Sequence, residues 1–185
     1  MPQREIMRII AGKYKRRMIY GPNVKTTRPT KDRVRESVFM ALSSLDDKIF
    51  LDLYAGSGSI GLEAISRGAK KTYFVDRNID AIKCIKENII NLNITEDYEI
   101  IKNSDVDALK AFKEKNIKFD VIYLDPPYEE GEYQKIIDMI FDFGLLNEYG
   151  IIICESDKKL DIINPHIVSS KEYKYGDIYV TFYRS

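Results

Sequence analysis

The sequence is poor in the residue types that build metal, disulfide and acid–base sites. It holds two cysteines and one histidine in 185 residues. Cys84 and Cys154 lack a C-x-x-C partner; the first falls in a helical pattern and the second closes an apolar strand. We therefore expect two small buried thiols in a reducing compartment. His166 lies in the C-terminal tail, where a structural role is expected, and the sequence predicts no metal site.

Long apolar segments are also missing. No run of apolar residues approaches the roughly 20 that cross a membrane. No charged and then apolar leader precedes a cleavage site. Because 44% of the residues are hydrophobic, the chain can still bury a full core, and one domain is the natural expectation. These features predict a cytoplasmic protein with no membrane partner.

The formal net charge of zero conceals an uneven distribution. Residues 1–35 contain eleven lysines and arginines against two acids, so the rest of the chain is acidic. A basic block of this kind favours a polyanion partner, with a solvated face as the alternative. The candidate phosphate-binding residues in the block are Arg16, Arg17, Arg28, Arg33 and Arg35.

A glycine-rich turn organises the rest of the chain. Residues 48–61 run from an apolar strand pattern through Gly56, Gly58 and Gly61 into a helical pattern, which is typical of a nucleotide-binding strand–loop–helix. The G-x-G-x-x-G spacing, with Asp76 further on, also fits a dinucleotide cofactor. Asp52, just before the loop, would repel a pyrophosphate but suits a ligand that carries an amino group. The carboxylate therefore favours S-adenosylmethionine over NAD.

The pattern of elements predicts an α/β fold. Strand patterns at 71–76, 98–102, 119–124 and 151–155 alternate with helical patterns, and two last strands at 167–175 and 178–183 form a hairpin. We expect a Rossmann-like, doubly wound, seven-stranded sheet that is mostly parallel with one antiparallel strand. A small basic β-hairpin (7–11 and 17–20) and a helix (30–44) precede it. The expected division is a basic extension at 1–45 and a catalytic domain at 46–185.

Four acids follow four of the predicted parallel strands. Asp52, Asp76, Asp105 and Asp125 all fall at carboxyl ends, where ligands of such sheets bind. Asp76 can accept both ribose hydroxyls, Asp105 can accept from an adenine amino group, and Asp52 can hold the methionyl amino group through the loop backbone or a water. Acids are also common in turns, so each assignment alone has a structural alternative.

The segment Asp125-Pro126-Pro127-Tyr128 carries the sharpest chemical signal. Two prolines supply no N–H and restrict the chain to extended geometry, so the segment is rigid. Asp125 and the carbonyl of Pro126 can accept the two N–H groups of an exocyclic amine and turn its lone pair toward a methyl group. Tyr128 can stack on the base, worth about 1–3 kcal/mol. Because no cysteine lies beside the prolines, covalent attack on a pyrimidine ring is disfavoured.

These segments together resemble a known family. Residues 7–12, Thr27 to Thr30 with Asp32 to Glu36, 51–58 and 125–128 are similar to the bacterial 16S ribosomal RNA guanine-N2 methyltransferases. The resemblance departs mildly at Asp76 and Tyr54, where glutamate and phenylalanine are frequent. It implies S-adenosylmethionine as methyl donor, and 16S ribosomal RNA within a partly assembled small ribosomal subunit as partner. The expected cofactor-binding residues are Asp52, Tyr54, Ala55, Gly56, Ser57, Gly58, Asp76, Arg77, Ser104 and Asp105, and the basic residues above are expected to bind the RNA.

Two other functions stay open. Adenine-N6 DNA methyltransferases share the D-P-P-Y segment, but 185 residues leave little room for a domain that reads DNA sequence. An NAD-dependent oxidoreductase would explain the glycines and would leave the D-P-P-Y segment and the basic N-terminus without a role.

Overall fold

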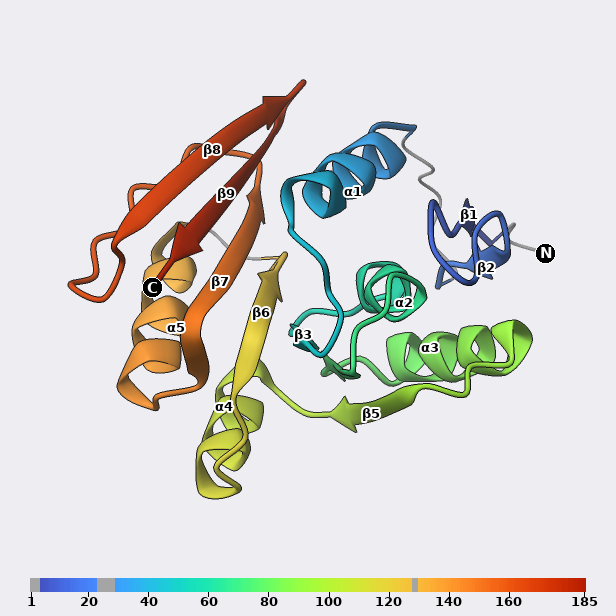
Figure 1. The fold of residues 1–185 in the computed structure, drawn as a ribbon, viewed down its shortest axis with the longest axis horizontal. Coiled ribbons are helices and arrows are strands. Elements are labelled where there is room, and N and C mark those ends of the chain that lie inside the picture. The colour runs from blue at the N-terminus through green and yellow to red at the C-terminus, as the bar shows by residue number, and fades with distance from the viewer. Residues whose placement is uncertain (1–3, 23–28, 128–129) are drawn as a thin grey trace.

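The computed structural model describes residues 4–22, 29–127 and 130–185. Seven of the described strands form one sheet: β3 (Ile49–Asp52), β4 (Lys71–Asp76), β5 (Asp97–Lys102), β6 (Phe119–Leu124), β7 (Leu146–Ser156), β8 (Ser169–Tyr175) and β9 (Ile178–Arg184). Their spatial order is β5-β4-β3-β6-β7-β9-β8 (Figure 1). The first five of this order pair in parallel, and β9 runs antiparallel to both β7 and β8. The predicted seven-stranded sheet with one reversed strand is confirmed.

Helices cover both faces of the sheet (Figure 1). They are α1 (Pro29–Ala41), α2 (Ser59–Ser66), α3 (Ile79–Leu92), α4 (Asp105–Glu114) and α5 (Glu130–Asp142). The first three cover one face, and α4 and α5 cover the other. The chain order reverses at β3, which has β4 on one side and β6 on the other, and ligands of open α/β sheets bind at such a reversal. Within the described part of the chain, no helix is long and apolar enough to cross a membrane.

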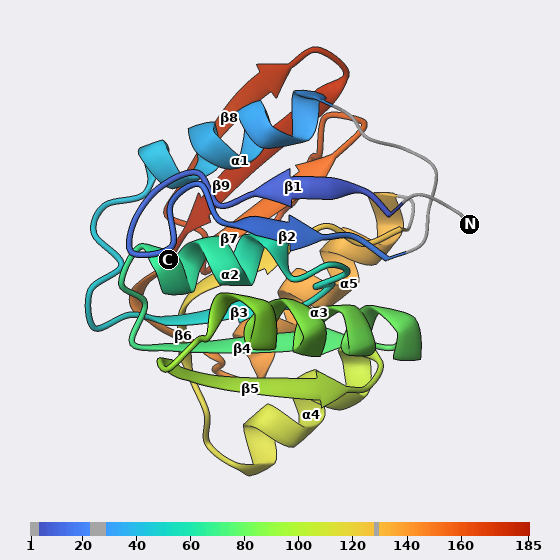
Figure 2. The same cartoon turned by 90° about the vertical axis from the view of Figure 1, so that its right-hand side faces the viewer.

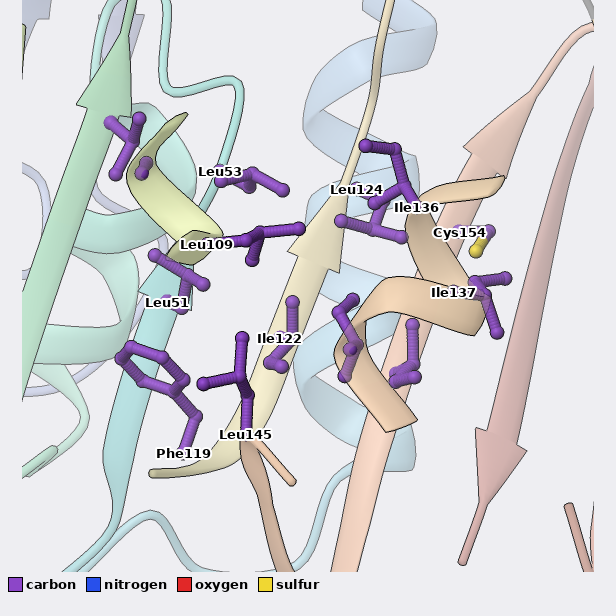
Figure 3. Close-up of a cluster of buried hydrophobic side chains, with 14 of the residues drawn as sticks. Leu51, Leu53, Leu109, Phe119, Ile122, Leu124, Ile136, Ile137, Leu145 and Cys154 are labelled. Carbon is purple, nitrogen blue, oxygen red and sulfur yellow. The ribbon is translucent and has the colours of Figure 1, made fainter. Parts of the chain in front are cut away.

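The largest apolar cluster lies between the sheet and the α4/α5 layer. Figure 3 shows Leu124 of β6 and Cys154 of β7 beside Ile136 and Ile137 of α5. All four side chains are at most 1% exposed. The parallel strands can be this apolar because helices cover both faces of the sheet. The two cysteines are free and buried, as predicted.

The N-terminal hairpin packs on α2 and α3 (Figure 2). Its strands are β1 (Ile6–Arg8) and β2 (Met18–Tyr20), which pair antiparallel. Ile9 and Ile19 are at most 1% exposed and share an apolar cluster with Ile85 of α3. Gly12 has a φ of +85°, and a Cβ there would come within 1.8 Å of the Ser66 carbonyl oxygen, so only glycine permits this approach.

A buried carboxylate fixes the hairpin to the sheet-covering helices. Glu63 of α2 is fully buried, and its two oxygens accept the backbone N–H groups of Ile10 and Ala11 at 2.9 and 3.0 Å. The guanidinium of Arg67 donates to the same carboxylate at 2.8 Å. The hairpin therefore shares its apolar core and its hydrogen bonds with helices that cover the sheet, and the expected division of the chain after residue 45 stays a prediction.

Several predicted boundaries differ from the structure. The helix expected at 30–44 runs from Pro29 to Ala41, with a proline at its first position, where a missing N–H costs nothing. The last parallel strand begins at Leu146, five residues before the predicted 151. The first strand of the last hairpin begins at Ser169, two residues after the predicted 167. These shifts leave the placement of the site unchanged.

Candidate functional site

The glycine loop joins β3 to α2 and uses its three glycines differently. Gly56 and Gly58 have φ values of +54° and +79°, in the left-handed region that favours glycine. Gly61, inside α2, has a different reason, because a Cβ there would meet the ring of Phe74 at 2.3 Å. A Cβ on Gly56 would meet nothing within 4 Å, so the backbone at Gly56 faces open space that a ligand can enter.

Asp52 lies beneath this loop. It is 2% exposed, and one carboxylate oxygen accepts the N–H of Gly61 at 3.0 Å. Burial raises the pKa of Asp52 to about 7; the Gly61 hydrogen bond opposes this rise, and the nearby charge of Asp76 adds to it. The carboxylate is thus close to its titration point at neutral pH, and a cation in the crevice would draw it into the charged form.

Asp76, at the end of β4, orders the same loop from the other side. Its two oxygens accept the N–H groups of Gly56 and Asn78 at 2.9 and 2.8 Å. A carboxylate has about four acceptor positions, so both oxygens can still accept further hydrogen bonds. Arg77 is exposed and lines the hollow above Asp76. The placement of both residues is compatible with the predicted ribose site.

Asp105 and Tyr54 close the floor of the crevice beside β5. The Tyr54 hydroxyl donates to one oxygen of Asp105 at 2.8 Å, and the other oxygen accepts the N–H of Val106 at 2.7 Å. Ser104 caps α4, since its hydroxyl accepts the N–H of Asp107 at 3.1 Å. Among the described contacts, the hydroxyl of Ser104, a predicted cofactor-binding residue, therefore acts as the N-cap of helix α4.

Two hollows open above the carboxyl ends of the strands. One, of about 290 Å³, is lined by Asp52, the loop from Tyr54 to Ser57, and Asp125. The other, of about 280 Å³, is lined by Asp76, Asp105 and Pro127. They share Tyr54 and Asp125, so an elongated ligand can occupy both. Together their volume falls within the roughly 300–1,000 Å³ of small-molecule sites.

The proline segment borders both hollows. Asp125 follows β6 directly and is exposed, Pro126 is buried, and Pro127 is exposed. The predicted catalytic Tyr128 lies outside the described residues. The structure therefore brings together the loop and strand-end acids with the first three residues of this segment.

A buried asparagine links the loop to the hairpin. Asn88 of α3 is fully buried; its side-chain oxygen accepts the N–H of Tyr20 at 2.8 Å, and its nitrogen donates to the Tyr20 carbonyl at 2.8 Å. The same nitrogen donates to the carbonyl of Ser57 at 3.0 Å. The hydrogen bond from Asn88 therefore fixes the backbone of Ser57, a residue that lines the first hollow.

Tyr123 and Glu155 are among the residues of the first hollow that the sequence interpretation missed. The hydroxyl of Tyr123 donates to the carboxylate of Glu155. Burial, and then the neighbouring charge of Glu155, raise the pKa of Tyr123 well above its ordinary value. Glu155 is a fifth acid at the carboxyl end of a strand, so the pattern that singled out the other four also applies to it.

Arg35 corrects a prediction. We expected it on a phosphate-binding surface, but it is 4% exposed. Its guanidinium donates to the Arg8 carbonyl at 2.5 Å and to Asp32 at 3.1 Å, and it lies 3.8 Å from Glu63. Burial lowers the pKa of Arg35 despite these acids. The residue ties α1 to the hairpin and to α2, which removes it from the outer surface.

The other basic residues remain at the surface. Arg16 and Arg33 are exposed and line one hollow with Arg8 and Lys15. Arg17 is exposed, and its guanidinium donates to the carbonyl of Asn91 in the last turn of α3 at 2.8 Å. The predicted Arg28 lies outside the described residues.

The described residues contain no group of three or more histidine, cysteine or acidic side chains arranged to hold a metal ion.

Comparison with known proteins gives consistent relatives. The profile of a protein family described as conserved hypothetical protein 95 matches residues 7–184. The provisionally named rRNA methyltransferase YlbH of Bacillus subtilis is 35% identical over 181 residues, covering 96% of this chain and 98% of that protein. Ribosomal RNA small subunit methyltransferase D of Haemophilus influenzae is 35% identical over 161 residues, covering 86% of this chain and 83% of that protein.

The fold agrees with a solved structure as well. The provisionally named methyltransferase yhhF of Escherichia coli superposes with a TM-score of 0.85 at 27% identity, covering 97% of this chain and 98% of that one.

Proposed function

The chain belongs to the family described as conserved hypothetical protein 95, and from this membership and the geometry of its crevice we propose that it transfers a methyl group from S-adenosylmethionine to the exocyclic N2 of a guanine in 16S ribosomal RNA. The observation that carries the proposal is the pair of hollows that share Asp125, one bordered by the glycine loop and one by the strand-end acids. Relatives named as rRNA methyltransferases support the substrate class.

The residues of the crevice fit S-adenosylmethionine. Asp76 and Asp105 line one hollow and offer carboxylate oxygens to ribose hydroxyls and an adenine amino group. Asp52, under the loop of the other hollow, suits the methionyl ammonium. A pyrophosphate would meet acids in both hollows. This charge pattern favours the methyl donor over NAD.

Asp125 and Pro126 would act on the acceptor amine. The amine of guanine is conjugated with its ring, so it becomes nucleophilic only when its hydrogens are held out of that plane. The carboxylate of Asp125 and the carbonyl of Pro126 accept hydrogen bonds from the two N–H groups of the amine and direct the lone pair of its nitrogen toward the methyl group. When bound, S-adenosylmethionine supplies a methyl group on a positive sulfur; the N–C bond forms as the S–C bond breaks, and the sulfur keeps the electron pair. Asp125, or water beside it, then takes the proton that the amine gives up.

The basic extension would hold the RNA. We propose that residues 1–45 form an RNA-binding extension in which Arg16, Arg17, Arg28 and Arg33 face phosphates, on a substrate that is a partly assembled small subunit. The exposed cluster of Arg8, Lys15, Arg16 and Arg33 supports this surface. Arg35 is left out because of its burial.

Calorimetry with S-adenosylhomocysteine, S-adenosylmethionine and NAD tests the cofactor. The two adenosyl ligands should bind and NAD should not. Asp76→Asn should weaken the adenosyl ligands at least tenfold, whereas Asp80→Asn, an exposed acid at the start of α3, should leave them unchanged. Tighter binding of NAD than of the adenosyl ligands would overturn the proposal.

A further inference from the structure

Glu155 lies beside Asp125 at the carboxyl ends of the parallel strands, where the two hollows open. The parallel register pairs Leu124 of β6 with Cys154 of β7, so the residues that follow them, Asp125 and Glu155, are neighbours across the two strands. Figure 3 shows Leu124 and Cys154 on the α5 side. Because side chains alternate along a strand, Glu155 points to the other face, toward α1, where it lines the same hollow as Asp125.

Two tyrosines fix Glu155 in place. The buried hydroxyl of Tyr123, on the same face, donates to one oxygen of the Glu155 carboxylate. The hydroxyl of Tyr133, on α5, donates to the backbone carbonyl of Glu155 at 2.6 Å. A phenol with a strongly raised pKa stays protonated and remains a donor, so the carboxylate that it meets serves as an acceptor. A side chain held in this way can present an oriented oxygen to a ligand.

The hollow is acidic where the acceptor base would enter. Asp52, Asp125, Glu155 and Glu5 line it, against the single guanidinium of Arg35 among its described lining residues. The Watson–Crick edge of guanine presents two neighbouring donors, the N1–H and the exocyclic amine, beside the O6 acceptor. Adenine presents an acceptor at N1, whose lone pair a carboxylate would repel. An ionised carboxylate only accepts hydrogen bonds, so this lining suits guanine.

We infer that Glu155 accepts the N1–H of the guanine whose exocyclic amine Asp125 orients, and that it selects guanine over bases with an acceptor at N1. The inference rests on the proposed function and assigns the base selection within it to one residue. Each carboxylate binds a different group on the Watson–Crick edge of the base. Asp125, together with the carbonyl of Pro126, accepts hydrogen bonds from the exocyclic amine, and Glu155 accepts one from the ring N1–H. Sites built to hydrogen-bond a donor reject analogues that lack it, and for one charged acceptor we expect a preference of about 10- to 100-fold.

The test uses 2-aminopurine, which keeps the exocyclic amine but has an acceptor at N1 and a hydrogen in place of the oxygen at C6. Small subunits are reconstituted from unmodified RNA that carries guanine or 2-aminopurine at the position where mass analysis finds the methyl group. The wild-type enzyme should methylate the guanine subunits at least tenfold faster. In Glu155→Gln the amide N–H can donate to the N1 of 2-aminopurine, so the ratio of the two rates should narrow at least tenfold. Glu148→Gln, an exposed acid near the opposite end of the same strand, should keep the wild-type ratio.

The outcomes separate this inference from the function beneath it. If the wild-type enzyme binds the methyl donor but methylates neither RNA, the proposed function fails and the inference fails with it. If the wild-type enzyme methylates guanine and 2-aminopurine equally, the inference alone is overturned, and this comparison does not depend on the folding of any variant. An unchanged ratio in a folded Glu155→Gln enzyme overturns it as well.

Discussion

Replacing Asp52 by asparagine should stabilise the fold and weaken binding of the methyl donor at the same time. Asparagine keeps an oxygen that can accept the N–H of Gly61, now 3.0 Å from the carboxylate, but it carries no charge. The wild-type side chain is 2% exposed, so its ionisation costs free energy in the folded state.

The pKa gives the size and the pH window of this cost. The pKa of Asp52 is raised from 3.8 to about 7, mainly by burial. A shift of about three units corresponds to about 4 kcal/mol at 1.36 kcal/mol per unit. The folded state holds the proton more tightly than the unfolded state, so the wild-type protein loses this stability as the pH rises from about 4 to about 7. Above that window the loss is complete and constant.

Urea unfolding at pH 4, 6 and 8 measures the effect. Asp52→Asn should be more stable than wild type at pH 8 by up to about 4 kcal/mol, and the advantage should shrink toward pH 4. The affinity of the wild-type protein for S-adenosylmethionine should fall by up to about tenfold per pH unit below 7, because the ammonium of the ligand favours the charged carboxylate. The variant should bind more weakly and show no such slope. An equal stability difference at every pH would refute the argument from burial.

Two further predictions concern the acceptor and the RNA surface. Asp125→Ala should reduce turnover at least a hundredfold while calorimetry finds S-adenosylmethionine affinity within a few-fold of wild type, since Asp125 is proposed to orient the amine; full activity would remove it from the mechanism. Reversing the charges of Arg16 and Arg33 should weaken RNA binding and flatten its salt dependence, by about 0.7 in the log–log slope for each phosphate that the variant no longer neutralises. The same change at Lys115 and Lys118, exposed between α4 and β6 on the face of the sheet opposite the hairpin, should leave the slope unchanged. An unchanged slope in the arginine variant would mean that these residues form only a solvated face.

The sheet could be predicted because its signals are local. Mostly apolar runs such as residues 119–124, each followed by a polar residue, follow from burial on both faces of a parallel sheet. The signal of the glycine loop is likewise local, since Gly56 and Gly58 adopt left-handed backbone within a few residues of Asp52. Asp52 and Asp76 could therefore be placed at the site from spacing alone.

Other parts depend on contacts between distant segments. The role of Arg35 is set by Glu63 in a later helix and by the carbonyl of Arg8, and neither pairing leaves a pattern in the sequence. Glu155 stands at a strand end like the four predicted acids, but its value as a site residue depends on Tyr123, 32 residues earlier, which is neighbouring only once β6 and β7 pair. Sequence patterns therefore predict which residues lie at the carboxyl ends of the strands. The pairing of distant segments decides which of their side chains line the site.

The most direct test of the central claim is to locate the transferred methyl group. Small ribosomal subunits that lack the modification are incubated with the protein and labelled S-adenosylmethionine, and the RNA is digested to nucleosides for mass analysis. The account predicts label in N2-methylguanosine from 16S RNA. Label in N6-methyladenosine, or no transfer by a protein that binds the donor, would contradict it.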